Sequence, residues 1–172
     1  MPQITCLTPI GEVTISAEDG AIVALDWGRG RDQEPTPLLR EAVTQLQDYF
    51  DGLRTGFDLP LAPFGSVFQQ RVWAALRAIP PGETRSYGDL AQLLKSSARA
   101  IGQANGANPI PILIPCHRVV ASGGRLGGYS GGEGPATKRV LLDLERQARA
   151  QNPSGHPQAE FLLPPAAGTT PR

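Results

Sequence analysis

The sequence predicts a fold of the α/β (α+β) class, in which a small N-terminal antiparallel sheet with one helix precedes a mainly helical C-terminal domain. Three short β-prone runs come first, at 3–8, 12–17 and 21–27. Two short helical segments around a tight turn, 86–94 and 98–105, follow in the second half of the chain. Together they predict a helix-turn-helix.

Turn-forming residues separate the N-terminal elements. Gly11 and the pair Asp19-Gly20 lie between the β-prone runs, which indicates an antiparallel meander. A helix is predicted over 37–50, ended by Gly52, because apolar residues recur there at three- and four-residue spacing: Leu38, Leu39, Ala42, Val43, Leu46, Tyr49 and Phe50. We expect one more strand at 57–62.

The second half opens with a predicted helix over 66–78, with Ser66 as its N-cap and Pro80-Pro81-Gly82 as its end. The second helix of the helix-turn-helix contains small residues that let its backbone approach a surface closely: Ala98, Ala100, Gly102 and Ala104.

The chain after this motif is predicted to be largely irregular. Prolines at 109, 111 and 115 favour an extended segment, and the apolar run 112–120 is typical of a strand. Residues 123–134 hold seven glycines and predict a loop. A last helix is expected over 137–150, with Val140, Leu141 and Leu144 on its apolar face, and residues 152–172 are expected to be disordered.

The charges are sorted along the chain, although the net charge is zero. Residues 1–65 hold four Lys and Arg against ten Asp and Glu, whereas 66–151 hold eleven against five. We therefore divide the chain into an N-terminal structural domain, 1–65, a second domain that carries the chemistry, 66–151, and a tail, 152–172. The basic balance of 66–151 suits a polyanionic partner.

Membrane-spanning segments, signal peptides and cysteine content indicate where in the cell a protein is located. No apolar stretch reaches the roughly 18 residues that span a membrane, and no signal peptide is visible. The two cysteines, Cys6 and Cys116, do not indicate a disulfide framework. We expect a cytoplasmic protein with no membrane partner.

The pair Cys116-His117 is the strongest candidate for chemistry. A thiol beside a histidine can be a thiolate nucleophile, although a cysteine in an Ile/Val run more often packs as a small hydrophobic residue. Several further residues that carry chemistry accompany this pair: Tyr87, Arg99, Asn108, Tyr129, Ser130 and Glu145.

These motifs resemble the O6-alkylguanine-DNA alkyltransferase family, whose members move an alkyl group from guanine onto their own cysteine. The matching stretches cover about 80 residues and stand in the family's order: Ser66–Trp73, Tyr87–Ala91, Ala98–Val119 with its Pro-Cys-His-Arg-Val, and Tyr129–Gly132. The resemblance implies a single-turnover DNA repair protein that acts as a monomer on duplex DNA containing O6-alkylguanine. It implies no cofactor.

The resemblance also assigns roles. Cys116 would accept the alkyl group, His117 would act as its base through an ordered water, and Glu145 would orient His117. Asn108 would form a hydrogen bond across the hinge between the recognition helix and the Cys116 segment.

For the flipped base, Arg99 would fill the vacated space in the duplex and Tyr87 would donate toward the purine N3. Backbone groups near Val119 and Ser130, with Tyr129, would line the base pocket, and Ser122 would contact a phosphate.

The sequence departs from the family in three respects. The turn before Arg99 is about two residues shorter and lacks the common glycine, the chain from Pro153 has no recognised counterpart, and no Cys/His cluster indicates the zinc site of some relatives.

Three other functions are compatible with parts of the pattern. A cysteine hydrolase with a Cys-His-Glu relay would leave the recognition helix unexplained. A non-catalytic alkylguanine-binding module would not need Cys116, and a transcriptional regulator would need a dimer interface that the sequence does not show.

Overall fold

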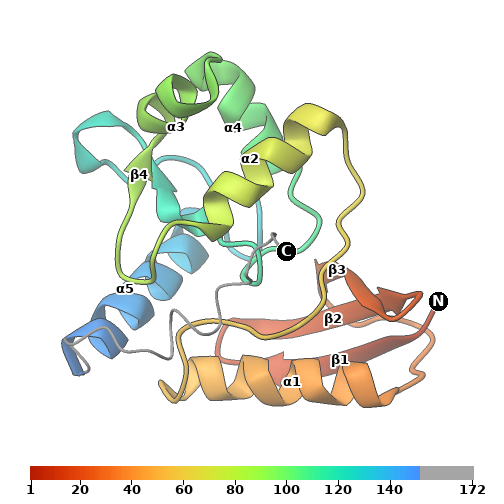
Figure 1. Cartoon of the computed structure of the whole chain (residues 1–172). Helices are drawn as coiled ribbons and strands as arrows, with labels where there is room; N and C mark the ends of the chain where they lie inside the picture. Colours follow the sequence, from red (N-terminus) through yellow and green to blue (C-terminus); the bar gives the residue numbers. More distant parts are fainter. Residues whose placement is uncertain (152–172) are drawn as a thin grey trace.

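The computed structural model describes residues 1–151, so the expectation for 152–172 lies outside the described residues (Figure 1). The N-terminal half is a three-stranded antiparallel sheet in the order β1-β2-β3, made of β1 (Gln3–Thr8), β2 (Gly11–Glu18) and β3 (Ala21–Trp27). The helix α1 (Pro37–Phe50) packs along this sheet (Figure 1). The predicted meander and helix are confirmed.

The hairpin turns have the expected chemistry. Asp19 and Gly20 both have positive φ angles, 51° and 79°, as a two-residue type I′ turn requires. At the start of α1, the Thr36 hydroxyl accepts a hydrogen bond from the Leu39 backbone N–H.

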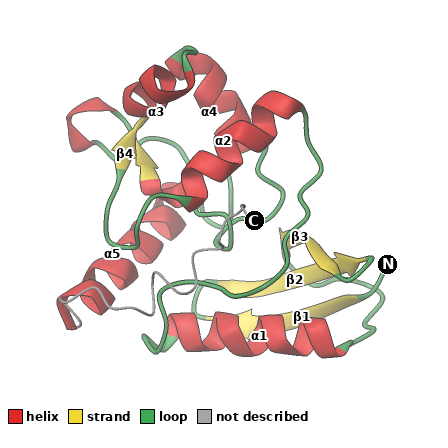
Figure 2. Ribbon diagram, in the orientation of Figure 1, coloured by secondary structure: helices red, strands yellow, loops and turns green. Residues whose placement is uncertain are grey.

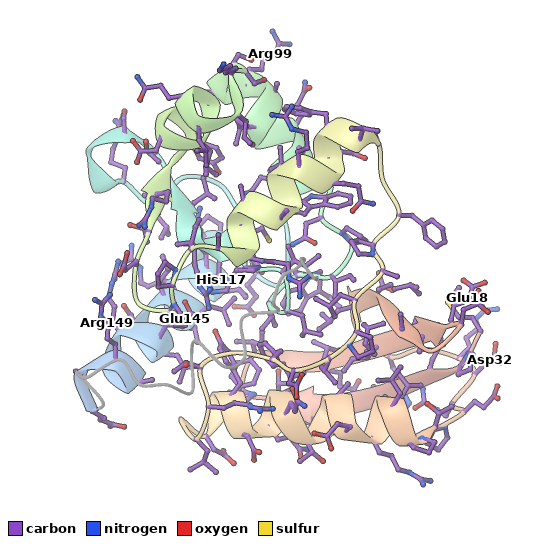
Figure 3. All side chains as sticks on the ribbon, in the orientation of Figure 1. Glu18, Asp32, Arg99, His117, Glu145 and Arg149 are labelled. Carbon is purple, nitrogen blue, oxygen red and sulfur yellow. The ribbon has the colours of Figure 1, made fainter. Side chains whose placement is uncertain are left out.

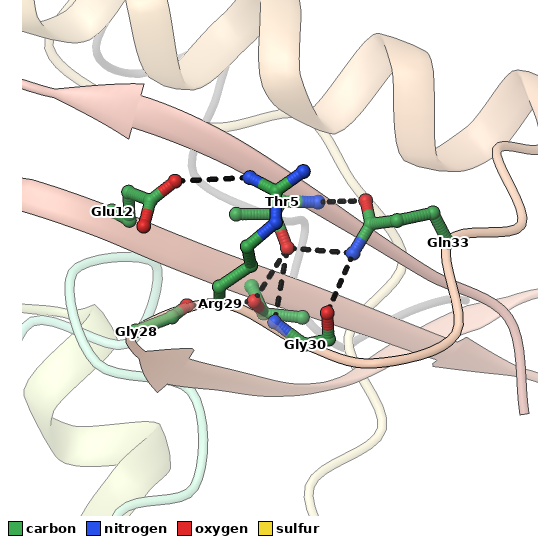
Figure 4. A network of polar contacts seen from close by, with 7 residues as sticks. Thr5, Glu12, Gly28, Arg29, Gly30 and Gln33 are labelled. Carbon is green, nitrogen blue, oxygen red and sulfur yellow. Dashed lines mark hydrogen bonds and ion pairs between the residues drawn. The ribbon is translucent and has the colours of Figure 1, made fainter.

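A polar network holds the loop that follows β3 against the edge of the sheet (Figure 4). The Gln33 side chain accepts from the Thr5 backbone N–H at 2.8 Å and donates to the Thr5 hydroxyl at 2.8 Å. The Gly30 N–H also donates to this hydroxyl, and Arg29 pairs with Glu12 at 3.0 Å. The exposed edge of β1 is thereby covered, which protects it from pairing with another chain.

The prediction of a strand at 57–62 is wrong. A single bridge joins Leu61 to Ile22, where Ile22 donates to the Pro60 carbonyl and Ala62 donates to the Ile22 carbonyl. Pro60 and Pro63 have no N–H groups, so the segment cannot extend this bridge into a ladder.

The second half is mainly helical, as predicted. Its elements are α2 (Val67–Arg77), β4 (Arg85–Ser86), α3 (Tyr87–Leu94), α4 (Ala98–Gly106), β5 (Val119–Val120) and α5 (Pro135–Gln151). Ser66 caps α2 in a capping box with Gln69, and β4 pairs with β5 in parallel. Figure 2 shows that most of the chain between α4 and α5 is loop.

The helix-turn-helix forms with the short turn. Lys95 takes the left-handed conformation, φ 55°, where a glycine is the usual residue. Ser97 then caps α4 by accepting from the Ala100 N–H at 3.1 Å. The indole N–H of buried Trp73 donates to the Ala104 carbonyl at 2.9 Å and so ties α2 to α4.

The assignment of Val140 to the apolar face of the last helix is wrong, because Val140 is 45 % exposed. The buried positions of α5 are instead Thr137, Lys138, Leu141, Leu142 and Glu145. Positions 138, 141, 142 and 145 follow helical spacing, so two charged residues share the stripe that faces the core. Among residues 1–151, no helix is long and apolar enough to cross a bilayer.

Replacing Gly65 with Ala should destabilise the fold, because a Cβ there would lie 2.4 Å from a ring carbon of Trp73. Trp73 is 2 % exposed and held by its hydrogen bond, so it cannot move freely. We expect a loss of about 1–3 kcal/mol in thermal or urea unfolding. Gly88→Ala is the matched control: its nearest neighbour would be 3.7 Å away, and helix propensity should make it neutral or stabilising.

Candidate active site

Cys116 is presented by a tight loop that Asn108 braces. The Asn108 side chain donates to the Ile114 carbonyl at 2.8 Å and accepts from the Ile110 N–H at 2.9 Å. Within this loop Ile112 has φ 74°, a strained conformation for a β-branched residue. Both polar ends of Asn108 therefore hold the segment in a shape that its sequence disfavours.

The prediction that the apolar run 112–120 forms a strand is wrong for Cys116. Residues Cys116–Arg118 form a 3₁₀ turn, and β5 begins only at Val119. The turn starts because Cys116 donates to the Ile114 carbonyl and Arg118 donates to the Pro115 carbonyl, at 2.8 and 3.0 Å. Apolar periodicity cannot distinguish such a buried turn from a short buried strand.

A buried carboxylate lies next to this turn. Glu145, on α5, is 1 % exposed and receives hydrogen bonds from three side chains. Figure 3 labels Glu145 and His117. His117 Nε2 lies 2.8 Å from its Oε2, the Tyr49 hydroxyl donates to the same oxygen at 2.6 Å, and Arg118 donates from Nε and Nη2 at 2.9 and 2.8 Å. Arg118 also donates to the Ile79 carbonyl at 2.7 Å.

The carboxylate is ionised in this setting. Burial raises the pKa of Glu145, but the charge of Arg118 and the hydrogen bonds from Arg118 and His117 outweigh burial and hold this pKa well below its ordinary range. Because an ionised carboxylate only accepts, His117 carries its proton on Nε2. Its Nδ1 is buried, has no protein partner within the described residues, and is free to accept a proton.

The Cys116 thiol is protonated in the free protein. Cys116 is 6 % exposed, and burial raises the pKa of its thiol, although Asn108, Lys138 and Tyr129 act in the opposite direction. The thiolate that a neighbouring histidine can produce is therefore not the resting state. Any nucleophilic reaction of Cys116 would therefore have to include ionisation of its thiol.

Lys138 is an unusual neighbour of the thiol. Its side chain is buried and donates to the Gly128 carbonyl at 3.1 Å. Burial lowers the pKa of Lys138 to about 8, and Cys116 acts in the opposite direction. The ammonium group would attract negative charge that develops on the sulfur.

A pocket of about 360 Å³ opens beside Cys116, lined by Tyr87, Gly102, Asn105, Gly106, Cys116, Gly128, Tyr129 and Ser130. A second cavity of about 180 Å³ adjoins it and extends past Asn108 to Leu25, Asp26 and Trp27 of β3. The absence of side chains at Gly102 and Gly106 widens the main pocket on its α4 side.

The structure brings together some of the candidate residues and not others. Cys116, Tyr87, Tyr129 and Ser130 line the main pocket, while His117 and Glu145 lie behind Cys116. The Val119 side chain is fully buried in β5. Arg99, at the start of α4, and Ser122 are exposed, and Figure 3 shows Arg99 at the far end of the helix-turn-helix from His117.

Four residues of the site were not identified from the sequence: Tyr49, Asn105, Arg118 and Lys138. The helical spacing of Lys138 and Glu145 is a signal that both face the core, and Arg118 belongs to the same motif as Cys116. Nothing in the sequence connects Tyr49 with a carboxylate 96 positions away. Within residues 1–151, no cluster of three or more His, Cys, Asp or Glu is arranged to hold a metal.

Comparison with known proteins identifies a family that has both halves of this fold. Residues 67–147 match the family model of the 6-O-methylguanine DNA methyltransferase DNA binding domain, and residues 4–63 match that of the ribonuclease-like domain of the same proteins. The chain is 44% identical over 155 residues to the constitutive methylated-DNA–protein-cysteine methyltransferase of Bacillus subtilis, covering 83% of this chain and 93% of that protein.

A second relative and a solved structure agree. The chain is 54% identical over 149 residues to the methylated-DNA–protein-cysteine methyltransferase of Mycobacterium bovis, covering 81% of this chain and 88% of that protein. The crystal structure of Mycobacterium tuberculosis OGT in complex with DNA superposes with a TM-score of 0.78 at 44% identity, covering 86% of this chain and 94% of that one.

Replacing Glu145 with Gln should lower the free energy of unfolding by about 3–5 kcal/mol at pH 7, because it leaves the buried Arg118 unpaired. The folded-state pKa of Glu145 is depressed, so its contribution is fully present above the unfolded-state pKa of about 4.3 and is lost as pH falls toward the folded-state value.

Urea unfolding of both proteins tests this. The gap between wild type and Glu145→Gln should stay constant from pH 7 to about pH 5 and narrow below about pH 4. A gap that widens in acid would contradict an ionised carboxylate.

Proposed function

The chain belongs to the 6-O-methylguanine DNA methyltransferase family, and on that premise we propose that Cys116 is the residue that receives the alkyl group. The protein binds DNA and repairs it by transferring an alkyl group to a cysteine. The fold is that of the family: an N-terminal sheet and helix followed by a mainly helical half with a helix-turn-helix.

One observation carries the assignment of the acceptor. Of the two cysteines, Cys116 lines the pocket and has an imidazole–carboxylate pair immediately behind it. Cys6 lies in β1, where burial raises its pKa and no base is in contact with it among the described residues. Of the two, only Cys116 borders a pocket that could hold a nucleobase and has a histidine next to it that could accept the thiol proton.

The proposed step is an in-line displacement. A bond forms between the Cys116 sulfur and the alkyl carbon as the bond from that carbon to the guanine O6 breaks. The thiol proton passes through an ordered water to His117 Nδ1, and the Glu145 carboxylate stabilises the imidazolium. Tyr87 donates toward the purine N3 as the leaving group gains electrons.

The surroundings of Cys116 supply the remaining stabilisation. The Lys138 ammonium attracts the sulfur as it ionises, and Asn108 fixes the loop that carries it. The backbone at Ser130, with Tyr129, forms a wall of the base pocket. Val119 begins β5, which pairs with β4 directly before Tyr87 on another side of the pocket.

The DNA is a duplex whose alkylated nucleotide is flipped into the pocket. Exposed Arg99 stands at the N-terminal end of α4, and the pocket lies at the C-terminal part of the same helix. The helix can therefore dock on DNA with Arg99 in the vacated stack, and Ser122 provides a phosphate contact. Residues 66–151, with their excess of basic side chains, make up the DNA-binding and transfer domain, and 1–65 supports it.

The proposal includes a cytoplasmic monomer. A free thiol acceptor and a DNA substrate both favour the reducing compartment that holds the DNA. One chain contributes every residue of the proposed site, so the chemistry requires no second copy.

The product should be a thioether on Cys116, and the protein should therefore react once. An unactivated S-alkyl carbon is not attacked by water, in contrast to the acyl group of a cysteine hydrolase. Excess O6-methylguanine DNA should load about one methyl group per chain, located on Cys116 by peptide mass. Cys6→Ser should load equally, and Cys116→Ser should not load. Sustained turnover with unmodified Cys116 would support the hydrolase instead.

Arg99→Ala should slow methyl transfer from duplex DNA by at least about tenfold and leave transfer from a single-stranded oligonucleotide nearly unchanged, because only the duplex requires a flipped base. Single-turnover rates at saturating DNA measure both. Arg139→Ala, on α5, is a control that removes the same charge elsewhere. Equal losses on the two substrates would contradict the intercalating role.

A further inference from the structure

We infer that Trp27, the last residue of β3, is a positioning residue for alkyl transfer, an inference that rests on the function proposed above. It holds the glycine-rich loop, residues 123–134, in place beside Cys116. Trp27 is half-buried, packs against the hydrophobic core, and lines the smaller of the two cavities together with Cys116 and Gly131. A residue of the N-terminal half therefore borders the site without belonging to the helix-turn-helix.

The contact between Trp27 and Gly131 is so close that it requires a glycine. A Cβ at position 131 would lie 2.5 Å from the indole Nε1 and 2.6 Å from both Cε2 and Cζ2. The neighbouring Gly132 and Gly134 have positive φ angles, 51° and 67°, but Gly131 does not. Position 131 thus lacks a side chain because of the indole beside it, and its backbone conformation would accept an alanine.

The glycine-rich loop has few other supports. Residues 126–130 form no backbone–backbone hydrogen bond with any part of the chain that the structure describes. Two polar contacts come from α5: Lys138 donates to the Gly128 carbonyl at 3.1 Å, and the Thr137 hydroxyl accepts from the Glu133 N–H at 2.9 Å. The Trp27 contact holds the loop from the N-terminal half, so its loss would leave the loop anchored to α5 alone.

The position of this loop matters for the reaction because the loop forms one wall of the site. Tyr129 and Ser130 line both cavities, and each cavity also reaches Cys116. Trp27 does not line the main pocket, so it acts on the reaction through the loop. A displacement of about 1 Å in a supporting residue can lower a rate by about a hundredfold.

Strand β3 contacts both segments that border Cys116. The Leu25 N–H donates to the Pro109 carbonyl at 2.9 Å, in the segment that leads to Cys116, and Trp27 contacts the loop on the other side of the smaller cavity. The N-terminal half therefore sets the distance between the acceptor and the wall that faces it, a role beyond general support of the fold.

The test is a double-mutant cycle of wild type, Trp27→Ala, Gly131→Ala and the double variant. Single-turnover methyl transfer to Cys116 is followed by protein mass at saturating DNA, with O6-methylguanine in a duplex and in a single strand. Affinity for an undamaged duplex and urea unfolding are measured on the same four proteins. Leu7→Ala, on β1, is the matched control, because it removes an exposed apolar side chain from the same sheet.

Trp27→Ala should slow transfer by at least about tenfold on both substrates, because the loop acts on the base after it has left the stack. Affinity for the undamaged duplex should change by less than about twofold, since neither Trp27 nor Gly131 lies on the helix-turn-helix. Trp27→Phe, which keeps a ring against the loop, should restore most of the rate, and Leu7→Ala should transfer at the wild-type rate.

The cycle distinguishes positioning from general stability. Gly131→Ala should slow transfer strongly in wild type, where its methyl group would displace the loop from Trp27. In the Trp27→Ala background the methyl group has room, so the same substitution should cost less than about twofold. Trp27→Leu takes the place of Trp27→Ala if that variant does not fold.

Two results would overturn the inference: a wild-type transfer rate in Trp27→Ala, or losses that simply multiply in the double variant. A rate that falls only in proportion to the unfolded fraction would likewise leave Trp27 a purely structural role. Failure of the proposed function is recognised separately, since Cys116 of the wild type would then receive no methyl group from either substrate.

Discussion

The buried ion pair between Glu145 and Arg118 is the interaction on which the site depends. Taking both charges out of water costs several kcal/mol per ion, and only good geometry with further hydrogen bonds offsets that cost. Here Arg118 binds both carboxylate oxygens, and Tyr49 and His117 add two more partners. The pair thereby joins α5 to the turn that carries Cys116, and Tyr49 extends the connection to α1 in the N-terminal half.

This arrangement explains how Cys116, the proposed acceptor, can be both reactive and protected. The thiol is protonated at rest because burial raises its pKa, so it is a poor target for oxidants and stray electrophiles. The groups proposed to favour its ionisation are His117 and Lys138, which are held by Glu145 and by the Gly128 carbonyl. In the proposed step they act once a base fills the pocket. Low reactivity of the resting thiol is an advantage for a protein that reacts only once, since each unintended reaction inactivates one protein molecule permanently.

Periodicity and turn residues predicted the regular elements, because local propensity and burial agree in them. The wrong predictions lie where tertiary contacts, and not local sequence, determine the backbone conformation. Residues 57–62 are extended but lack the N–H groups for a ladder, and Cys116 lies in a turn set by hydrogen bonds to Ile114 and Pro115. The motif placed Cys116, His117 and Glu145 in one site, yet it gave no account of Tyr49 or Lys138, whose roles come from burial beside a partner distant in sequence.

The helix α4 joins the proposed DNA-docking residue to the pocket beside Cys116. Arg99 stands in its first turn and Asn105 in its last, so the two are separated by roughly 9 Å along the helix axis at 1.5 Å per residue. The Trp73–Ala104 hydrogen bond ties this helix to α2. The side chain proposed to replace the base in the duplex and the pocket that would receive the base thus lie at the two ends of one helix. In the proposed mode of binding, docking of this helix on DNA therefore also brings the flipped base to the pocket beside Cys116.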